Sequence, residues 1–363
     1  MKYKINITYL YKKIIQVIFK IFYGKIFYIP NKKFKNILIK NVKNNFFNPY
    51  KKYYIYTIKD GSIYTDSVQH VAAITDNFLF SKSSFQHANN RIVSAKNNVV
   101  LKKGTPNIRR KLSGTVLSLV QGASGENYFH WLLDILPKIR IYQNNYSLNN
   151  INYFYLPPLK SSQIESLKLL GIAKERILNS KIYKHIKADK IIFITHPWYD
   201  KGKFHDQSWN LPIWIIKWIR KNFLKYKKKF FCSNRILIDR SESNFKHCQI
   251  INKDEIETFL IKKGFRIYKI GKYSFAKQIF MFWNAKCIIG AHGAAFTNLI
   301  FCKPNTKIIE FMPFNHPGKN YERISKINKL NYLNIFSKRK YLKNKDGDIY
   351  IDLNILKKKL NYN

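Results

Sequence analysis

The segment Cys287-Ile-Ile-Gly-Ala-His-Gly-Ala-Ala-Phe-Thr-Asn-Leu-Ile-Phe301 decides the fold of this chain. Its apolar start ends at Gly290, which predicts a short buried strand. Small residues then surround His292, so the backbone can turn tightly and a ligand can approach its N–H groups. Apolar residues at helical spacing follow, and a second strand is predicted at 307–311. Together these elements predict a βαβ unit whose helix begins at the carboxyl edge of the sheet.

Two interpretations of this turn stay open on spacing alone. Free N–H groups and the helix dipole favour an anion such as phosphate at this position. The turn lacks the G-x-G-x-x-G pattern, however, and glycine turns between strands and helices are common in α/β proteins without such a ligand. His292 fits a packed or capping histidine as well as a catalytic one.

The composition is that of a globular but very basic protein. The chain has 363 residues, of which 46% are hydrophobic, and a formal net charge of +46. It is long enough for two domains with their own cores. The charge favours a polyanionic partner such as nucleic acid, anionic lipid or an acidic glycan. Lysine greatly outnumbers arginine, and Ile, Asn, Tyr and Phe are also abundant, so a drift toward AT-rich codons is an alternative explanation of the charge that needs no ligand. We find no nucleic-acid-reading motif and expect no specific nucleic-acid partner.

The N-terminal region is the most basic part of the chain. Residues 1–50 are weakly patterned and predict a basic N-terminal arm. Residues 1–60 contain fourteen lysines and one aspartate, interleaved with Ile, Phe and Tyr. This composition is typical of a segment on an anionic membrane face, and equally of an exposed arm with a few core contacts. The apolar runs are shorter than a membrane span needs, and we expect no secretory signal.

Cysteine usage and the strand and helix signals define the expected location and domains. Four cysteines without zinc spacing favour a reduced, cytoplasmic location, with a peripheral position on the inner membrane face left open.

The predicted domains are 51–225 and 230–345, followed by a tail at 346–363. Strands are predicted at 52–58, 68–74, 99–101, 117–120, 152–156, 176–178, 190–195, 235–240 and 265–270, and helices at 161–170, 214–223, 274–285 and 321–333. The aromatic loop at 196–209 predicts a ligand-binding loop or a surface lid.

A histidine–carboxylate pair lies in the first predicted domain. Asn127 is a suitable cap for a helix with an apolar stripe, and Pro137 predicts a kink or the end of that helix. Glu126, His130 and Asp134 recur every four residues, so they share one helical face. A histidine one turn from a carboxylate can act as an acid–base pair, or the two can simply bond to each other.

An arginine opens the second predicted domain. Arg240 ends the predicted strand at 235–240. An arginine at the carboxyl end of a strand suits phosphate recognition. A salt bridge to Asp239 or Glu242 is the alternative.

Three blocks of sequence together resemble glycosyltransferase family 61. They are Asn127-Tyr-Phe-His-Trp-Leu-Leu-Asp-Ile-Leu-Pro137, then Arg240 with Ile250-Ile-Asn-Lys-Asp-Glu255, then Gly290-Ala-His-Gly-Ala-Ala-Phe-Thr-Asn298 with Ile308-Ile-Glu-Phe311. Their order and spacing match as well, and the likeness covers about residues 114–333. The resemblance implies a GT-B type α/β fold, with two Rossmann-like domains facing across a cleft.

The resemblance also implies an activity. It implies an inverting, metal-independent transfer of a sugar from a nucleotide-sugar, commonly a UDP-sugar, to a hydroxyl of a glycan or lipid-linked acceptor. Bacterial relatives of this type tend to belong to capsule or surface-polysaccharide synthesis. No cofactor and no metal are expected, because the nucleotide-sugar is a substrate.

The same resemblance assigns donor-binding residues. Gly293 and Ala294 would hold the donor diphosphate through backbone N–H groups. His292 and Arg240 would add side-chain donors that stabilise the leaving diphosphate in place of a metal. Glu310, at the end of a predicted strand, would bind the ribose hydroxyls of the donor.

On the acceptor side, the resemblance assigns the acid–base pair. Either Asp134 or His130 would take the proton of the acceptor hydroxyl, with Asp134 preferred as the base and His130 as its partner. One feature departs from the family, which often has a second arginine before the residue that matches Asn252. Lys246 or His247 stands in that region here. The alternative function is a catalytically inactive carbohydrate- or polyanion-binding protein on the same fold.

Overall fold

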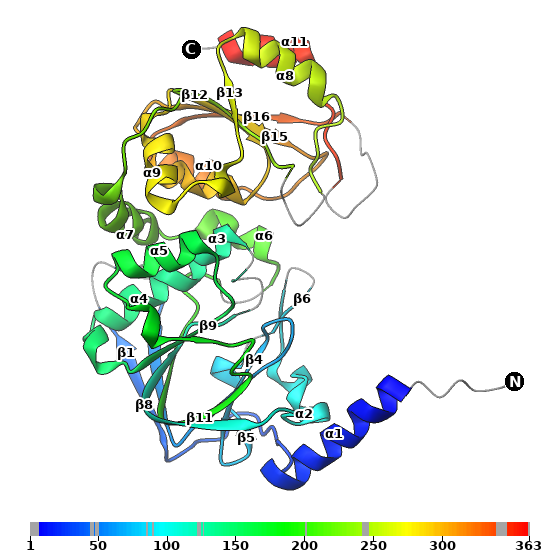
Figure 1. Cartoon of the computed structure of the whole chain (residues 1–363), viewed down its shortest axis with the longest axis vertical. Coiled ribbons are helices and arrows are strands. Elements are labelled where there is room, and N and C mark those ends of the chain that lie inside the picture. Colours follow the sequence, from blue (N-terminus) through cyan, green and yellow to red (C-terminus); the bar gives the residue numbers. More distant parts are fainter. Residues whose placement is uncertain are drawn as a thin grey trace, which may run out of the picture. The chain divides into compact units, whose positions relative to one another are not determined.

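The computed structural model describes residues 7–43, 47, 51–84, 86–88, 91–121, 125, 127–199, 202–241, 247–338 and 347–361 (Figure 1). Packing divides the chain into two compact units. The first unit contains residues 1–160 and 173–204, and the second contains residues 161–172 and 205–363. Residues 205–225 therefore group with the second unit, whereas the sequence placed them in the first predicted domain. Both units combine helices with sheets that contain parallel strands, which confirms the α/β class.

The first unit is built on a mixed sheet of nine strands. Its order is β10-β9-β8-β11-β3-β4-β5, and β2 pairs with both β1 and β11. The contacts of β8 with β11 and β9, and of β9 with β10, are parallel; the other pairs are antiparallel. The sheet strands are β1 Ile37–Val42, β2 Tyr53–Lys59, β3 Ser62–Thr65, β4 Val71–Thr75, β5 Phe78–Leu79, β8 Arg109–Ser118, β9 Tyr153–Leu156, β10 Ile177–Asn179 and β11 His185–Ile194, and a separate hairpin joins β6 Gln86–Ala88 to β7 Arg91–Val93.

The order of these strands fixes the position of the first candidate site. Because β8 and β11 are parallel neighbours, their carboxyl ends lie at the same edge of the sheet. Both strands are apolar and fully buried near these ends, where Val116, Leu117 and Ile191 are inaccessible to solvent. Polar residues that follow the two strands therefore meet at that edge.

The N-terminal segment differs from the predicted arm. It contains the helix α1 Ile7–Tyr23, and β1 pairs with β2 along its whole length. The strand predicted at 99–101 is wrong, because this stretch lies at the start of the short helix α2 Val100–Lys103. The predicted strands at 190–195 and 117–120 correspond to the carboxyl ends of the longer strands β11 and β8.

One helix crosses the first unit from Asn127 onward. The side chain of Asn127 accepts from the N–H of Phe129 at 2.9 Å, so the predicted cap is confirmed. The helix runs as α3 Tyr128–His130, a π-helical turn Trp131–Ile135 and α4 Leu136–Gln143. Pro137 therefore does not end the helix. The wide π turn before it accommodates a residue that has no N–H to donate.

The second unit is built on five parallel strands. Their order is β13-β12-β14-β15-β16. The strands are β12 Arg235–Ile238, β13 Arg266–Tyr268, β14 Cys287–Ala291, β15 Lys307–Met312 and β16 Asn331–Phe336. The helices are α5 Ser161–Leu169, α6 Phe204–Gln207, α7 Ile213–Phe223, α8 Lys253–Lys262, α9 Phe275–Asn284, α10 Asn320–Ile327 and α11 Leu353–Asn361. In chain order the strands read 2-1-3-4-5, so the order reverses between β12 and β14. Ligands of open α/β sheets bind at such a reversal, beyond the carboxyl ends of the strands.

One predicted helix in the C-terminal region is corrected, and the last segment packs in the core. The helix predicted at 321–333 ends with α10, and β16 follows after a turn in which Lys329 has φ of +56°. The predicted tail at 346–363 also contributes to the core. Ile349, Ile351 and Leu356 are completely buried there.

Candidate active site

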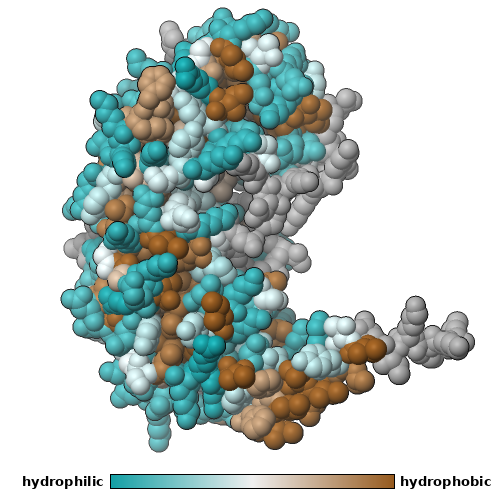
Figure 2. Space-filling model, in the orientation of Figure 1, coloured by the Kyte–Doolittle hydropathy of each residue, from teal (hydrophilic) through white to brown (hydrophobic). Residues whose placement is uncertain are grey.

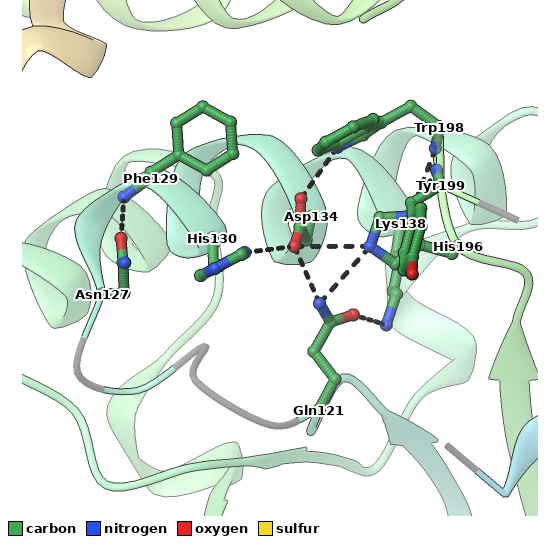
Figure 3. Close-up of polar contacts among 9 residues, drawn as sticks. All are labelled: Gln121, Asn127, Phe129, His130, Asp134, Lys138, His196, Trp198 and Tyr199. Carbon is green, nitrogen blue, oxygen red and sulfur yellow. Dashed lines mark hydrogen bonds and ion pairs between the residues drawn. The ribbon is translucent and has the colours of Figure 1, made fainter. Parts of the chain in front are cut away.

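The first candidate site lies beyond the carboxyl ends of β8 and β11 (Figure 3). Gln121 follows β8, and His196 follows β11. The helix that begins after Asn127 presents His130, Asp134 and Lys138 toward them, because these residues recur every four positions. Glu126, which the sequence placed on the same face, lies outside the described residues.

Asp134 is the centre of this cluster. It is completely buried. Its Oδ2 accepts from Nε2 of Gln121 at 2.9 Å and lies 2.7 Å from Nδ1 of His130 and 3.3 Å from Nε2 of His196. Its Oδ1 accepts from the indole Nε1 of Trp198 at 2.8 Å. Four side-chain nitrogens thus surround a carboxylate that is closed to solvent.

The contacts of His196 define its proton position. Its Nδ1 lies 2.9 Å from the backbone N of Tyr199 and 3.3 Å from that of Trp198. Because backbone N–H groups can only donate, Nδ1 is the acceptor and Nε2 carries the proton. Burial lowers the pKa of His196, although Asp134 opposes this effect. His196 therefore acts as a neutral donor toward Asp134.

Asp134 is held in its ionised form. Burial alone raises the pKa of its carboxyl group, but the contacts with His196 and His130 outweigh burial and lower the pKa below the usual aspartate range. Nζ of Lys138 donates to Oε1 of Gln121 at 2.8 Å, which turns the amide of Gln121 toward Asp134. Burial lowers the pKa of Lys138 to about 8, with Asp134 acting in the opposite direction.

His130 has a different environment from Asp134. An ionised carboxylate can only accept, so Nδ1 of His130 carries the proton in their 2.7 Å contact. Its side chain is 16% exposed, and Nε2 has no hydrogen-bond partner within the described part of the chain. In neutral imidazole this nitrogen is a free proton acceptor. The arrangement does not fit Asp134 as the base, because its oxygens are buried and fully engaged.

Aromatic side chains enclose the pair. The ring centroid of Phe204 lies 5.0 Å from that of His130 and 4.7 Å from that of Trp198. Phe129 lies 5.5 Å from His130 on the same helix. Trp198, Tyr199 and Phe204 are buried, so this part of the predicted 196–209 loop packs against the site and is not a surface lid.

The second candidate site lies at the carboxyl ends of β14 and β15 in the second unit. Nδ1 of His292 lies 2.6 Å from Oε1 of Glu310, whose side chain is 1% exposed. The hydroxyl of Tyr332, from β16, donates to the other oxygen of Glu310. Both oxygens of Glu310 are thus engaged within the unit, and its predicted ribose contact stays a prediction. The contacts fit a carboxylate that orients His292.

Arg240 meets the glycine turn at the reversal of strand order. A Cβ atom on Gly293 would lie 2.8 Å from both Cζ and Nη1 of Arg240, so the guanidinium packs directly on the bare backbone. Nη1 is buried without a hydrogen-bond partner among the described residues. The alternative ion pair with Asp239 is not formed. Instead, Oδ1 of Asp239 lies 3.7 Å from Nζ of Lys253, and its Oδ2 lies 3.9 Å from Nζ of Lys269.

The helix after the turn is a 3-10 helix, Ala294–Phe301, in which the N–H of Phe296 donates to the carbonyl of Gly293 at 3.0 Å. Ala294 and Ala295 precede this first hydrogen bond, so their N–H groups have no partner inside the helix. A second histidine lies beside this turn, since the rings of His316 and His292 are 4.2 Å apart. Nδ1 of His316 accepts from the N–H of Gly318 at 3.1 Å, which leaves Nε2 as its donor.

The structure brings the acid–base pair together in the first unit and the donor-binding residues together in the second. His130 and Asp134 are in contact in the first, and Arg240, His292, Gly293, Ala294 and Glu310 surround one turn in the second. Lys246 and Glu242 lie outside the described residues. The sequence missed Gln121, Lys138, His196, Trp198, His316 and Tyr332. A signal for two of them was present, because Gln121 and His196 directly follow predicted strands.

Comparison with known proteins identifies the class of this chain. The family model described as Glycosyltransferase 61 matches residues 128–309, half of the chain. The matched segment contains His130, Asp134, His196, Arg240 and His292. No curated protein matches the chain. The chain belongs to glycosyltransferase family 61, and it is therefore a glycosyltransferase that binds a donor and an acceptor.

Proposed function

We propose that this enzyme transfers a sugar from a nucleotide-sugar, with a UDP-sugar as the expected donor, to a hydroxyl of a glycan or lipid-linked acceptor in surface-polysaccharide synthesis. The transfer inverts the anomeric centre and needs no metal or cofactor. The observation that carries the proposal is the His130–Asp134 pair, in which Asp134 fixes Nδ1 of His130 and leaves Nε2 as an acceptor with no partner among the residues that the structure describes. Family membership supports the reaction class.

In the proposed reaction His130 is the base. Its Nε2 takes the proton of the acceptor hydroxyl while that oxygen attacks the anomeric carbon. The bond from the anomeric carbon to the diphosphate breaks, and the diphosphate leaves with the bonding electrons. Asp134 is a positioning residue that holds the imidazole in this tautomer and stabilises the imidazolium that forms. His196, Gln121 and Trp198 keep Asp134 ionised for this task.

The second unit is proposed to bind the donor diphosphate. Nη1 of Arg240 is buried beside the turn without a partner in the described part of the chain, and a guanidinium suits a diphosphate because it can donate two parallel hydrogen bonds. The N–H groups of Gly293 and Ala294 add donors from the backbone. Glu310 engages Nδ1 of His292, so Nε2 is the ring nitrogen proposed to contact the leaving group.

The proposal includes the GT-B arrangement, in which the two units face each other across a cleft and act on one donor–acceptor pair. The parallel sheet of the second unit supports a donor-binding role for that unit, because its strand order reverses beside Arg240 and Gly293.

A nucleotide panel tests the proposal. Thermal unfolding is measured with UDP, GDP, CMP, ADP and duplex DNA, each with and without EDTA. We expect one nucleoside diphosphate to raise the unfolding temperature selectively and equally in EDTA, because a ligand that binds only the folded state stabilises it. A rise that EDTA abolishes would contradict metal independence. The absence of a rise with any nucleotide would contradict the donor assignment and favour the inactive polyanion-binding alternative.

A further inference from the structure

Helix α1 turns its apolar side away from the protein. None of its residues is buried. Its solvent-facing apolar residues are Ile7, Leu10, Ile14, Val17, Ile18, Ile21 and Phe22, all exposed, with Ile7 at 79% and Ile21 at 77%. At 100° per residue these side chains fall within one continuous sector of the helix. Figure 2 shows hydrophobic side chains gathered along this helix at the edge of the first unit.

The opposite side of α1 faces the first unit, and there Ile15, Gln16, Phe19, Lys20 and Tyr23 are half-buried. Nζ of Lys20 donates to the carbonyl of Lys102 at 2.9 Å. The hydroxyl of Tyr23 accepts from the N–H of Arg109 at 2.9 Å, and the ring of Tyr23 lies 5.0 Å from that of His185. A helix that packs on a core shows the opposite orientation, with its apolar stripe inward. The attachment of α1 therefore holds the apolar face outward.

The charge around this face is of one sign. Helix α1 contains no acidic residue, Lys13 is exposed beside the apolar sector, and Lys12 is exposed farther round the helix. Residues 1–60 contain fourteen lysines and one acidic residue, Asp60. A second copy placed on this face would bring two lysine-rich helices together without acidic partners, within a chain of net charge +46. An anionic lipid surface would match both the apolar face and the lysines.

We propose that α1 docks the first unit onto an anionic lipid bilayer, lying in the plane of the headgroups with its apolar face among the upper acyl chains. The lysines beside the apolar sector contact the lipid phosphates. Within the described residues, no helix combines the length and apolarity needed to cross a bilayer. The inference is independent of the donor and base assignments, because it uses none of those residues.

Vesicle flotation tests the docking. The full chain is mixed with vesicles of phosphatidylcholine alone or of phosphatidylcholine and phosphatidylglycerol in equal parts. We expect binding to the anionic vesicles, and binding to neutral vesicles weaker by about tenfold or more, since each lysine near an anionic surface adds to the attraction. Failure of the wild-type chain to float with anionic vesicles would overturn the proposal.

A pair of matched variants assigns the binding to α1. Ile14→Asp places a charge in the apolar sector, whereas Ile182→Asp changes another exposed isoleucine of the same unit that is 62% exposed and lies outside α1. We expect Ile14→Asp to lower vesicle partitioning by about tenfold or more and Ile182→Asp to leave it unchanged. Both side chains are exposed, so the far-ultraviolet circular dichroism and the nucleotide-induced rise in unfolding temperature should stay at wild-type values.

Two results would contradict the assignment. Equal vesicle binding by both variants would show that α1 does not dock. A wild-type dimer in lipid-free light scattering that Ile14→Asp converts to a monomer would show that the face binds a second copy and not lipid.

Discussion

Asp134 and His130 differ in accessibility, and this difference assigns their proposed roles. Asp134 accepts from four nitrogens in a buried position, so a further proton has no oxygen free to receive it. His130 keeps one ring nitrogen without a partner among the described residues and is partly exposed. The sequence predicted the pair from its four-residue spacing and preferred Asp134 as the base, because spacing does not report burial.

The first prediction concerns His130. His130→Gln removes the proposed base but keeps a hydrogen-bond donor near Asp134. We expect the transfer rate to fall by about a hundredfold or more, with nucleotide stabilisation unchanged. Initial rates with the donor chosen from the nucleotide panel measure this effect, and added imidazole should partly restore the rate of a His130→Ala variant.

A second His–Asp pair provides the matched control. His70 lies 3.2 Å from Asp66 at the same four-residue spacing, outside the candidate site. His70→Gln should keep the wild-type transfer rate. If His130→Gln retains full activity while Asp134→Asn loses it, Asp134 is the base and the assignment made here is wrong.

The second prediction concerns the contact of Gly293 with Arg240. In Gly293→Ala, the new Cβ would meet the guanidinium of Arg240 at 2.8 Å, and the flexible end of that side chain must move. We expect nucleotide affinity to fall by about tenfold, since a charge-assisted hydrogen bond contributes about 1.5–3 kcal/mol, with a stability change under about 1 kcal/mol. Titration calorimetry and urea unfolding measure the two effects.

Gly271 offers the control for this substitution. No heavy atom lies within 4 Å of a Cβ atom at that position, so Gly271→Ala should leave affinity unchanged. Equal affinity of Gly293→Ala and the wild-type protein would place Arg240 outside the diphosphate site.

At the scale of elements, strand order decides which side chains meet. Gln121 and His196 are far apart in sequence, and they contact Asp134 because β8 and β11 are parallel neighbours. The sequence predicted the carboxyl ends of both strands, but periodicity contains no information on which strands are adjacent. The α/β class and the glycine turn could be predicted because they depend on local spacing.

Local periodicity also failed near the end of the second unit, where the strand β16 was predicted as part of a helix. Tyr332, which donates to Glu310, lies in β16, where a helix had been predicted. The apolar residues of that stretch fit either period over so short a length. The turn at Lys329, which separates α10 from β16, requires a positive φ that the sequence does not signal with glycine.

The third prediction concerns the pH dependence of stability. It depends on His185 of β11, whose ring contacts that of Tyr23 in α1. Burial lowers the pKa of His185 to about 4, with a smaller contribution from Arg109 in the same direction. Between pH 6.5 and 4 the unfolded chain binds a proton that the folded chain does not, so stability falls as the pH decreases through this range. The expected loss is up to about 3 kcal/mol, at about 1.4 kcal/mol for each pH unit.

Urea unfolding at several pH values measures this loss. His185→Phe should remove most of the slope between pH 6.5 and 4. The lowered pKa of Asp134 affects stability in a separate pH range, below pH 3.8. An unchanged slope in His185→Phe would show that His185 is protonated in the folded protein.

At the scale of the whole molecule, the net charge of +46 permits general binding to polyanions. The fourth prediction separates this effect from donor binding. Affinity for duplex DNA should fall by orders of magnitude when salt rises from about 50 to 200 mM, because binding releases counterions. Affinity for the selected nucleotide should change by less than about tenfold. Fluorescence titrations over a salt series measure both, and equally steep salt dependence would assign nucleotide binding to net charge alone.

The most direct test of the account is the affinity of the selected nucleoside diphosphate for Arg240→Ala and for Arg266→Ala. Both variants remove one positive charge from the second unit, but Arg266 is exposed on β13 and only Arg240 packs on the glycine turn. Titration calorimetry should show affinity about ten- to a hundredfold weaker for Arg240→Ala, and wild-type affinity for Arg266→Ala. Equal affinities in both variants would contradict a diphosphate site at the turn between β14 and its helix.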